Sequence, residues 1–274
     1  MIDTPQHSPS PPPAARRVRY FLRDDDIGEL TDALRAFVET FVSRKLPVSY
    51  QIIPARLTED CAAYLLEVER NHPELIEFGQ HGLRHEMTLR GKRLKREFGP
   101  ERSLDQQQAD IAEGQRILAD RLGRRLVLFT PPQHKFDRNT VTAAAAAGHK
   151  VFSAACYATP HHRLAYGLGR RLGLSSIAHH GISYHGGVRP EAPLAEISIS
   201  IAVDNGRRIT TGADALPAAI AEAEAGSDLV GLMFHHAVYA GPEGRAALDA
   251  LAVCLSRYPA QDFHRLGDLA DGQA

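Results

Sequence analysis

Short apolar segments alternate with longer amphipathic ones along almost the whole chain, and this alternation restricts the fold more than any other feature. The apolar segments are typical of buried strands, and the amphipathic ones of helices that cover a sheet. We expect strands at 18–25, 47–55, 75–80, 126–130, 150–155, 175–182, 196–203 and 229–234. The expected helices lie between them, at 29–45, 58–72, 104–122, 138–147, 214–225 and 242–258. These βα units, joined without an interior linker, predict one α/β domain, most simply a barrel.

The first 17 residues differ from this pattern, because they contain five prolines and almost no residue that could pack. We expect a disordered leader at 1–17 and a single catalytic domain at 18–274. The leader has no hydrophobic core of the kind that secretory signals carry, and no stretch approaches the ~18 apolar residues of a membrane span. The three cysteines are far apart, which argues against a disulfide framework and against a cysteine-based zinc site. A cytoplasmic protein is therefore expected.

The charge of the chain is balanced, with 32 Lys and Arg residues against 33 Asp and Glu residues and a net charge of -1. A protein without a basic excess has no overall field that attracts nucleic acid. We therefore expect neither a nucleic acid nor a membrane as a partner, and the sequence predicts no oligomeric state.

The residues with the greatest chemical capacity lie where expected strands end. Three aspartates end the first strand, two histidines follow the third, a Pro pair follows the fourth, and two histidines end the last. Because the carboxyl ends of parallel strands share one face, these side chains are expected to meet in one cleft. The residues are Asp24, Asp25, Asp26, His81, His85, Thr130, Pro131, Pro132, His235 and His236.

Each of these groups taken alone has an ordinary structural explanation. Aspartate beside a helix start is a common cap, and two adjacent histidines on a strand point to opposite faces, so only one belongs to a given site. In combination they suggest chemistry. Two imidazoles and one carboxylate suit a catalytic divalent ion, a second carboxylate can accept a proton from water, and a further histidine can protonate a leaving group. The set predicts metal-assisted hydrolysis.

The motifs RDDDIG (23–28), GQHGLRH (79–85), FTPP (129–132) and LVGLMFHH (229–236) occur in an order that resembles the polysaccharide deacetylases of the NodB-homology type, carbohydrate esterase family 4. The resemblance implies a distorted (β/α)7 barrel. It implies that Asp25 is the general base and His235 the general acid. It also implies a metal held by Asp26, His81 and His85, with Thr130, Pro131 and Pro132 lining the substrate groove.

The sequence departs from the family pattern at several positions. The family's Arg before the Pro pair is replaced by Thr130, and we expect Arg23 to supply that charge beside the base. Asp204 is a candidate for the family's aspartate that tunes the acid histidine. Ile27-Gly28 stands where the family has Gly-Pro, and the resemblance requires a turn there so that Asp25 and Asp26 reach the same site. The alternative register makes Asp24 the base and Asp25 the ligand, since alternate strand residues point to opposite faces.

The resulting hypothesis is a divalent-metal hydrolase that removes an acyl group, expected to be acetyl, from an amide nitrogen of an N-acetylated sugar or glycoconjugate. Zinc is the expected ion, and cobalt, nickel or manganese suit the same ligands. Two alternatives remain open: hydrolysis of a non-sugar amide C–N bond, and a non-catalytic carbohydrate-binding barrel. We expect Arg23 and His236 to contribute to the substrate site and the loops 86–103 and 156–195 to set specificity. His134 and Lys135 are the best further candidates for the site. Five other histidines are expected to be surface or loop residues: His161, His162, His179, His180 and His185.

Overall fold

The computed structural model describes residues 17–271 apart from 90, 95–96, 157–163, 165–167, 169–186 and 190–191. Within these residues a nine-stranded sheet has the order β10-β11-β1-β2-β3-β6-β7-β9-β8, and all its neighbours are parallel except β8 and β9. The strands are β1 (Arg19–Ile27), β2 (Val48–Ile52), β3 (Ile76–His81), β6 (Leu128–Thr130), β7 (Val151–Phe152), β8 (Gly187–Val188), β9 (Ala195–Glu196), β10 (Ile201–Ala202) and β11 (Leu229–Phe234).

The sheet curls into a barrel because one stretch of chain pairs on two sides. Its first part, β9, pairs with β7, and its last part, β10, pairs with β11. Between them the Ile199 amide donates to the Ala154 carbonyl, and the Ser200 amide donates to the Gly231 carbonyl. Within the described residues, taking this stretch as one strand and omitting the antiparallel β8 leaves the seven strands of a distorted (β/α)7 barrel. The expected fold class is confirmed.

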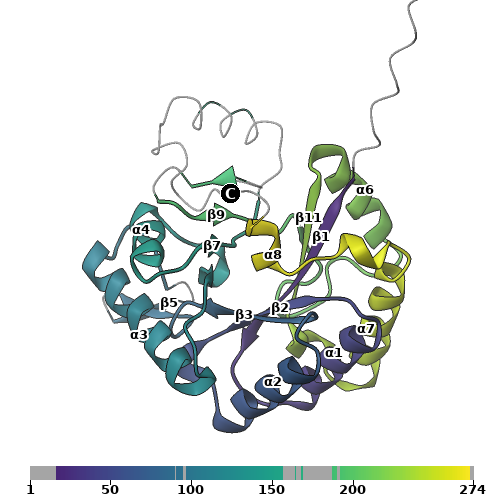
Figure 1. Cartoon of the computed structure of the whole chain (residues 1–274), viewed down its shortest axis with the longest axis horizontal. Helices are drawn as coiled ribbons and strands as arrows, with labels where there is room; N and C mark the ends of the chain where they lie inside the picture. The colour runs from purple at the N-terminus through teal and green to yellow at the C-terminus, as the bar shows by residue number, and fades with distance from the viewer. Residues whose placement is uncertain are drawn as a thin grey trace, which may run out of the picture.

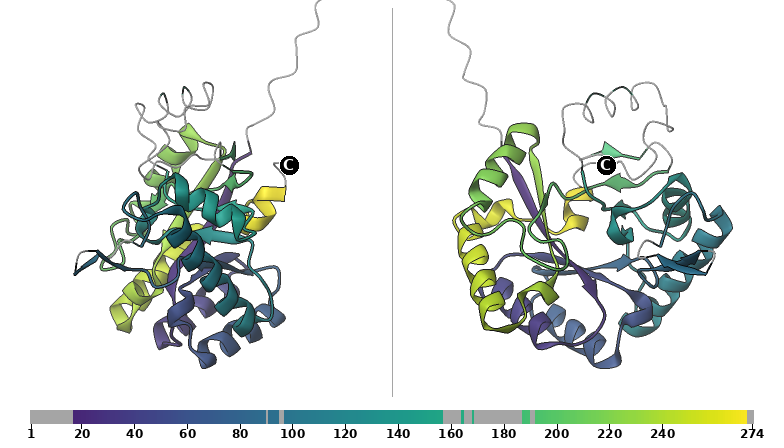
Figure 2. Two further views of the ribbon diagram at one scale, coloured as in Figure 1. Left: turned by 90° about the vertical axis from the view of Figure 1, so that its left-hand side faces the viewer. Right: turned by 180° about the vertical axis from the view of Figure 1, so that it is seen from behind.

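Helices form an outer layer around the curled sheet (Figures 1 and 2). For example, Phe37 and Phe41 of the first helix both pack edge to face on Phe234 of β11, with ring centroids 5.7 and 5.5 Å apart. The helices are α1 (Asp32–Ser43), α2 (Glu59–Asn71), α3 (Leu104–Leu122), α4 (Arg138–Ala146), α6 (Leu216–Gly226), α7 (Gly241–Leu255) and α8 (Leu266–Asp271), with short 3-10 turns η1 (Pro54–Arg56), η2 (Pro132–His134), η4 (His236–Tyr239) and η5 (Ala260–Asp262).

The end of the chain closes one mouth of the barrel. Leu266 and Leu269 of α8 are buried against Phe21, Leu229 and Val151 near the starts of their strands. The Leu266 amide also donates to the Ser49 hydroxyl at the start of β2. The barrel is therefore covered at the amino ends of its strands, which leaves the carboxyl ends for ligands.

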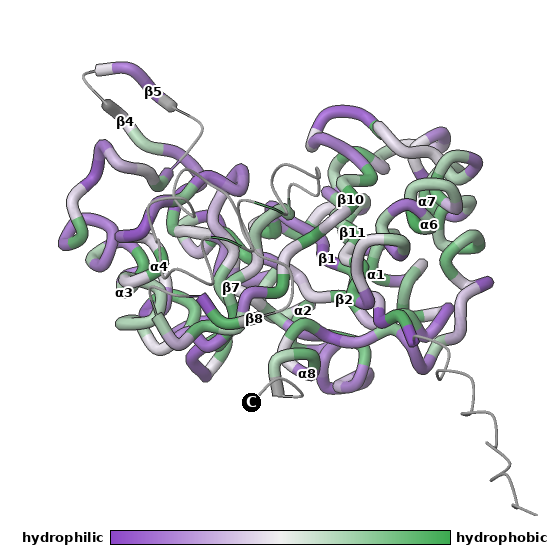
Figure 3. The backbone as a smooth tube through the Cα atoms, turned by 90° about the horizontal axis from the view of Figure 1, so that it is seen from above, coloured by the Kyte–Doolittle hydropathy of each residue, from purple (hydrophilic) through white to green (hydrophobic). Residues whose placement is uncertain are grey.

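Most expected elements are present. The strand expected at 196–203 is divided into β9 and β10, and the strand expected at 175–182 lies outside the described residues, as do residues 1–16 of the expected leader. A hairpin of β4 (Met87–Leu89) and β5 (Lys92–Leu94) was not expected, and it projects from the body of the molecule (Figure 3). Among the described residues, no helix has the length and apolar character needed to cross a bilayer.

Candidate active site

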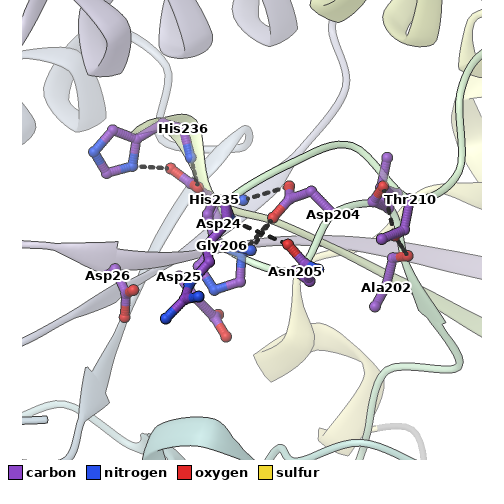
Figure 4. Close-up of polar contacts among 12 residues, drawn as sticks. Asp24, Asp25, Asp26, Ala202, Asp204, Asn205, Gly206, Thr210, His235 and His236 are labelled. Atoms are coloured by element: carbon purple, nitrogen blue, oxygen red, sulfur yellow. Dashed lines mark hydrogen bonds and ion pairs between the residues drawn. The ribbon is translucent and has the colours of Figure 1, made fainter. Parts of the chain in front are cut away.

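The end of β1 carries three consecutive aspartates, and a bulge in the strand changes the directions in which their side chains point. The pairing of β1 with β2 shifts between Asp24 and Ile27, and Asp26 has a φ of 69°, in the left-handed region. A bulge lets neighbouring residues escape the alternation of a regular strand. As a result Asp25 and Asp26 both line the same cavity, while Asp24 is bonded to His236 on another side (Figure 4). The expected turn thus occurs at Asp26, not at Ile27-Gly28.

Asp26, His81 and His85 lie close enough together to hold one ion. Asp26 Oδ1 is 3.3 Å from His81 Nε2 and 3.0 Å from His85 Nε2, and one donor atom from each residue lies within 4.8 Å of the others. His81 ends β3, and His85 follows in a loop with a φ of 67°. The structure therefore brings together the three residues that the resemblance assigned to a metal.

The donor atoms of this cluster fit a divalent cation. His81 Nδ1 donates to the Thr130 carbonyl oxygen at 3.0 Å, so Nε2 of the neutral ring has a free lone pair directed at Asp26. Asp26 Oδ1 is buried and has no hydrogen-bond partner among the described residues. Two imidazole nitrogens and a carboxylate oxygen are ligands that zinc accepts in catalytic sites. A cation there would satisfy all three atoms.

Asp25 is held as a carboxylate by Arg23. The guanidinium Nε donates to Asp25 Oδ1 at 2.8 Å and its NH2 group donates to Oδ2 at 2.9 Å. Burial raises the pKa of Asp25, but the charge of Arg23 and the smaller effects of the nearby histidines together outweigh it, so the pKa lies below its usual value. Arg23 is itself fully buried and donates to the carbonyl and hydroxyl oxygens of Ser153. The structure places Arg23 where the sequence predicted a charge beside the base.

His235 forms a hydrogen-bonded pair with Asp204, which follows β10. His235 Nδ1 donates to Asp204 Oδ1 at 2.6 Å, and the His235 amide donates to Oδ2 at 2.9 Å. Burial lowers the pKa of His235, but the Asp204 hydrogen bond and the nearby Asp25 charge outweigh it and raise the pKa to about 9. The imidazole is therefore a cation at neutral pH, as a general acid requires.

His236 points away from this site. Its Nδ1 donates to Asp24 Oδ2 at 3.1 Å and its amide donates to Asp24 Oδ1 at 2.8 Å, and both side chains are buried (Figure 4). His236 does not line the cavity that contains the other site residues, within the described part of the chain. Its predicted contribution to substrate binding has no support in this geometry.

A cavity of about 760 Å³ opens at the carboxyl ends of the strands. It has the size of a small-molecule site. Besides the residues above, its walls include Arg56, Arg93, Gln133, His134 and Arg207. The His134 Nδ1 lies 3.4 Å from a terminal nitrogen of Arg23, which joins the η2 turn to the Asp25 site.

Other predicted site residues have different places. Thr130 is buried and its hydroxyl donates to Gln51 Oε1, and Pro131 and Pro132 are buried outside the cavity wall. These three residues were expected to line the groove, but the next two residues, Gln133 and His134, line the cavity instead. Lys135 is exposed outside the cavity wall. Five histidines lie outside the described residues: His161, His162, His179, His180 and His185.

Some residues of the site could not be found from the sequence. Arg56 ends the η1 turn and Arg207 lies in the segment after β10, and no motif distinguishes them from the other arginines of the chain. Glu97 lies between β5 and α3, and its carboxylate contacts the loop that carries His85. It follows His85 by 12 positions and forms no pattern with it.

Comparison with known proteins supports the family resemblance. A family model, Polysaccharide deacetylase, matches residues 24–152, which contain the three aspartates, His81, His85 and the Pro pair. No curated protein matches the chain. Among solved structures, a putative polysaccharide deacetylase from Mycobacterium smegmatis matches at 15% identity with a TM-score of 0.65, covering 98% of this chain and 94% of that one.

Two further solved structures show the same fold. A family 4 acetyl xylan esterase from Clostridium thermocellum, in complex with a cobalt ion, matches at 13% identity with a TM-score of 0.54, covering 91% of this chain and 89% of that one. A CE4 family pseudoenzyme from Bacillus anthracis matches at 11% identity with a TM-score of 0.54, covering 93% of this chain and 66% of that one. The family model over residues 24–152 confirms the expected resemblance, and the three solved structures show that this chain has the same fold.

Proposed function

We propose that this polysaccharide deacetylase-like chain is a divalent-metal hydrolase that removes an acetyl group from the amide nitrogen of an N-acetylated, sugar-like substrate. The observation that carries the proposal is the position of Asp25 and His235 in one cavity with the Asp26, His81 and His85 cluster. A base, an acid and a set of metal ligands thus surround a common space. Fold alone does not establish turnover, because one matched structure is a pseudoenzyme.

The residues of the chain divide the work of hydrolysis. Zinc or a similar ion held by Asp26, His81 and His85 would supply Lewis acidity to the reacting carbonyl and lower the pKa of water. Asp25, kept ionised by Arg23, accepts the proton of the attacking water. His235, kept protonated by Asp204, donates a proton to the departing amine nitrogen, which is too basic to leave as an anion.

The walls of the cavity favour a substrate that carries negative charge. Arg56 and Arg93 approach from one side and share the carboxylate of Glu86, whereas Arg207 lies in the loop beside His235. The Asp25, Asp26 and Asp204 carboxylates are already engaged with Arg23, the histidine cluster and His235. An N-acetylated sugar with a phosphate or carboxylate group therefore complements the cavity better than a neutral glycan does.

A second candidate is hydrolysis of a non-sugar amide with the same residues. The observation that favours it is that no Phe, Tyr or Trp side chain is among the residues that line the cavity in the described part of the chain, since sugar rings commonly stack on such groups. The two functions differ in their products. Deacetylation releases acetate, whereas hydrolysis of a ureide or primary amide releases ammonia.

The test measures bound metal and product release in matched variants of neighbouring residues. The chain is loaded with zinc or cobalt and assayed for acetate and ammonia with N-acetylated sugars, their phosphorylated forms and small amides. Asp25→Asn should keep the metal and lose roughly 10²–10⁴-fold in rate, because it removes only the base. Asp26→Ala should lose both metal and rate, because it removes one ligand of three.

Two outcomes would contradict the proposal. If the wild-type chain binds metal but releases neither product from any of these substrates, it is a binding protein. If Asp24→Ala is as damaging as Asp26→Ala while Asp25→Asn is silent, the base and ligand are shifted by one residue.

A further inference from the structure

Glu97 has no part in the proposed chemistry, yet its carboxylate is one of the most heavily bonded groups near the site. It receives three consecutive backbone amides, from Leu83 at 2.9 Å, Arg84 at 3.0 Å and His85 at 3.1 Å. Its side chain is only 1% exposed. Burial raises the pKa of the Glu97 carboxyl, whereas the three amide donors act in the opposite direction and favour its ionised form. Hydrogen bonds to the ionised form are roughly twice as strong as neutral ones. These hydrogen bonds therefore fix the backbone of residues 83–85, which includes His85.

The loop that receives these bonds has no regular structure of its own. Gly82 and His85 both have left-handed φ values, of 61° and 67°, which lie outside the range of regular helices and strands. Left-handed backbone is costly for a residue other than glycine and persists only where surrounding contacts impose it. Glu97 supplies such contacts, because successive amides of this loop converge on one anion instead of pairing with carbonyls.

Other parts of the fold hold the carbonyls of the same loop. Gln80 donates from its side-chain amide to the Gly82 carbonyl at 3.0 Å, and the Ala55 amide donates to the Leu83 carbonyl at 2.9 Å. A side chain at Gly82 would collide with Glu97 Oε2. The loop is therefore built around the carboxylate, with glycine at the point of closest approach.

Glu97 itself is anchored to the core. The next residue, Phe98, is fully buried and packs on Phe129 of β6 with ring centroids 5.8 Å apart. The Arg102 guanidinium donates to the Glu97 carbonyl at 3.2 Å and forms an ion pair with Asp110 of α3. The position of the carboxylate relative to the barrel is thus fixed by contacts other than those with the 82–85 loop.

We propose that Glu97 is a positioning residue for the metal site, whose carboxylate holds the 82–85 loop so that His85 meets Asp26 and His81. This inference rests on the proposed metal site and adds a residue to it. Groups that orient a ligand from outside the coordination sphere typically contribute about 10–100-fold in metal affinity. Glu97 acts on the ligand through its backbone, so its removal should loosen one ligand of three and leave the other two in place.

The test compares Co²⁺ binding by the full, metal-free chain and by Glu97→Gln. The amide keeps the size of the side chain but directs an NH2 group at amides that need an acceptor. We expect the Kd for Co²⁺ to rise by about 10–100-fold and the visible absorption spectrum of bound Co²⁺ to change. Glu97→Asp, which keeps the charge but shortens the reach, should give a smaller rise and serves if the first variant does not fold.

Glu77→Gln is the matched control. Glu77 lies on the same segment of chain as His81, in β3, and its carboxylate also accepts a backbone amide, from Gly267, together with the Ser49 hydroxyl. It stands at the covered end of the barrel, so its variant should lose stability without a change in the Kd for Co²⁺ or in the spectrum.

The results separate this inference from the proposed function. If the wild-type chain binds no Co²⁺, the metal site itself is wrong and the inference falls with it. If the wild type binds Co²⁺ and the folded Glu97 variants bind it equally tightly with the same spectrum, Glu97 is merely structural and the proposed function stands. An equal loss of affinity in Glu77→Gln would also overturn the positioning role.

Discussion

Two Asp–His pairs meet at the end of β11, and they are almost the same in chemistry but different in position. In each, one carboxylate accepts both the backbone amide and the Nδ1 proton of a histidine: Asp204 with His235, and Asp24 with His236. Both aspartates are fully buried. His235 lines the cavity with Asp25 and the Asp26, His81 and His85 cluster, whereas the side chain of His236 does not line it and is 6% exposed. The pair alone does not make an acid, because the ring must also reach a substrate.

The two carboxylates also differ in how many donors they receive. Asp204 accepts two further hydrogen bonds, from the Gly206 amide at 2.8 Å and the Tyr239 hydroxyl at 3.1 Å. Among the described residues, Asp24 has only the two donors of His236. Loss of the histidine ring should therefore leave Asp204 satisfied and Asp24 with a single bond. The catalytic pair is expected to be the one whose histidine is structurally dispensable.

Removing the ring of His235 should give the largest effect on rate. His235→Ala should lower turnover of amide substrates by roughly 10²–10⁴-fold, because a positioned acid contributes about that much. The loss should be mildest for activated esters, whose leaving groups depart without a proton. Steady-state rates on both substrate classes, with metal content measured in parallel, test this. A loss below tenfold, or a loss of metal, would place the acid elsewhere.

Removing the ring of His236 should act on stability instead. His236→Ala breaks a buried pair and leaves Asp24 with one donor, which costs about 3–5 kcal/mol in the free energy of unfolding. Urea unfolding at pH 7 measures it, with His235→Ala as the matched variant, whose cost should be clearly smaller. If the folded His236 variant loses as much rate as the His235 variant, the comparison between the pairs is wrong.

The charge of Asp204 should set the alkaline limit of activity. The pKa of His235 is raised to about 9, and an acid must be protonated, so activity falls as the pH rises through that value. Asp204→Asn removes the charge, lowers the pKa and should move the alkaline limb of kcat/KM down by about one pH unit or more. Tyr239→Phe, which removes a neutral donor, should move it less. An unchanged limb in the Asp204 variant would show that another group titrates there.

Much of the fold could be predicted because it depends on local patterns. The helix at 104–122 was predicted with its exact bounds, since Ser103 caps its start and Gly123 ends it in a left-handed conformation. The division of the 196–203 strand could not be predicted, because it depends on which neighbour each half meets when the barrel closes. The β4–β5 hairpin has too few apolar residues to produce a strand pattern.

The site was predictable only where a motif marks it. Asp25, Asp26, His81, His85 and His235 stand in short motifs at strand ends, and the structure brings them to one cavity. Glu97 and Arg207 reach the site through tertiary contacts that leave no spacing in the sequence. The assignment of Thr130, Pro131 and Pro132 to the groove did not foresee the left-handed turn at Gln133 and His134, which directs these next two residues to the cavity wall.

Another buried histidine, His149, sharpens the comparison, because no carboxylate among the described residues pairs with it. His149 is 4% exposed, its Nε2 lies 3.1 Å from Gln80 Oε1, and burial lowers its pKa to about 3. The unfolded chain binds a proton at this residue near the ordinary pKa of 6.5, whereas the folded protein does not. Stability from His149 is therefore complete above that pH and is lost as the pH falls below it, by about 2 kcal/mol between pH 7 and pH 5. His149→Gln cannot titrate and should flatten the pH dependence of the unfolding free energy by that amount, measured in urea at both pH values. If the variant and the wild type show an identical pH dependence, His149 is protonated in the folded protein. A buried histidine at this position would then be charged without a carboxylate partner.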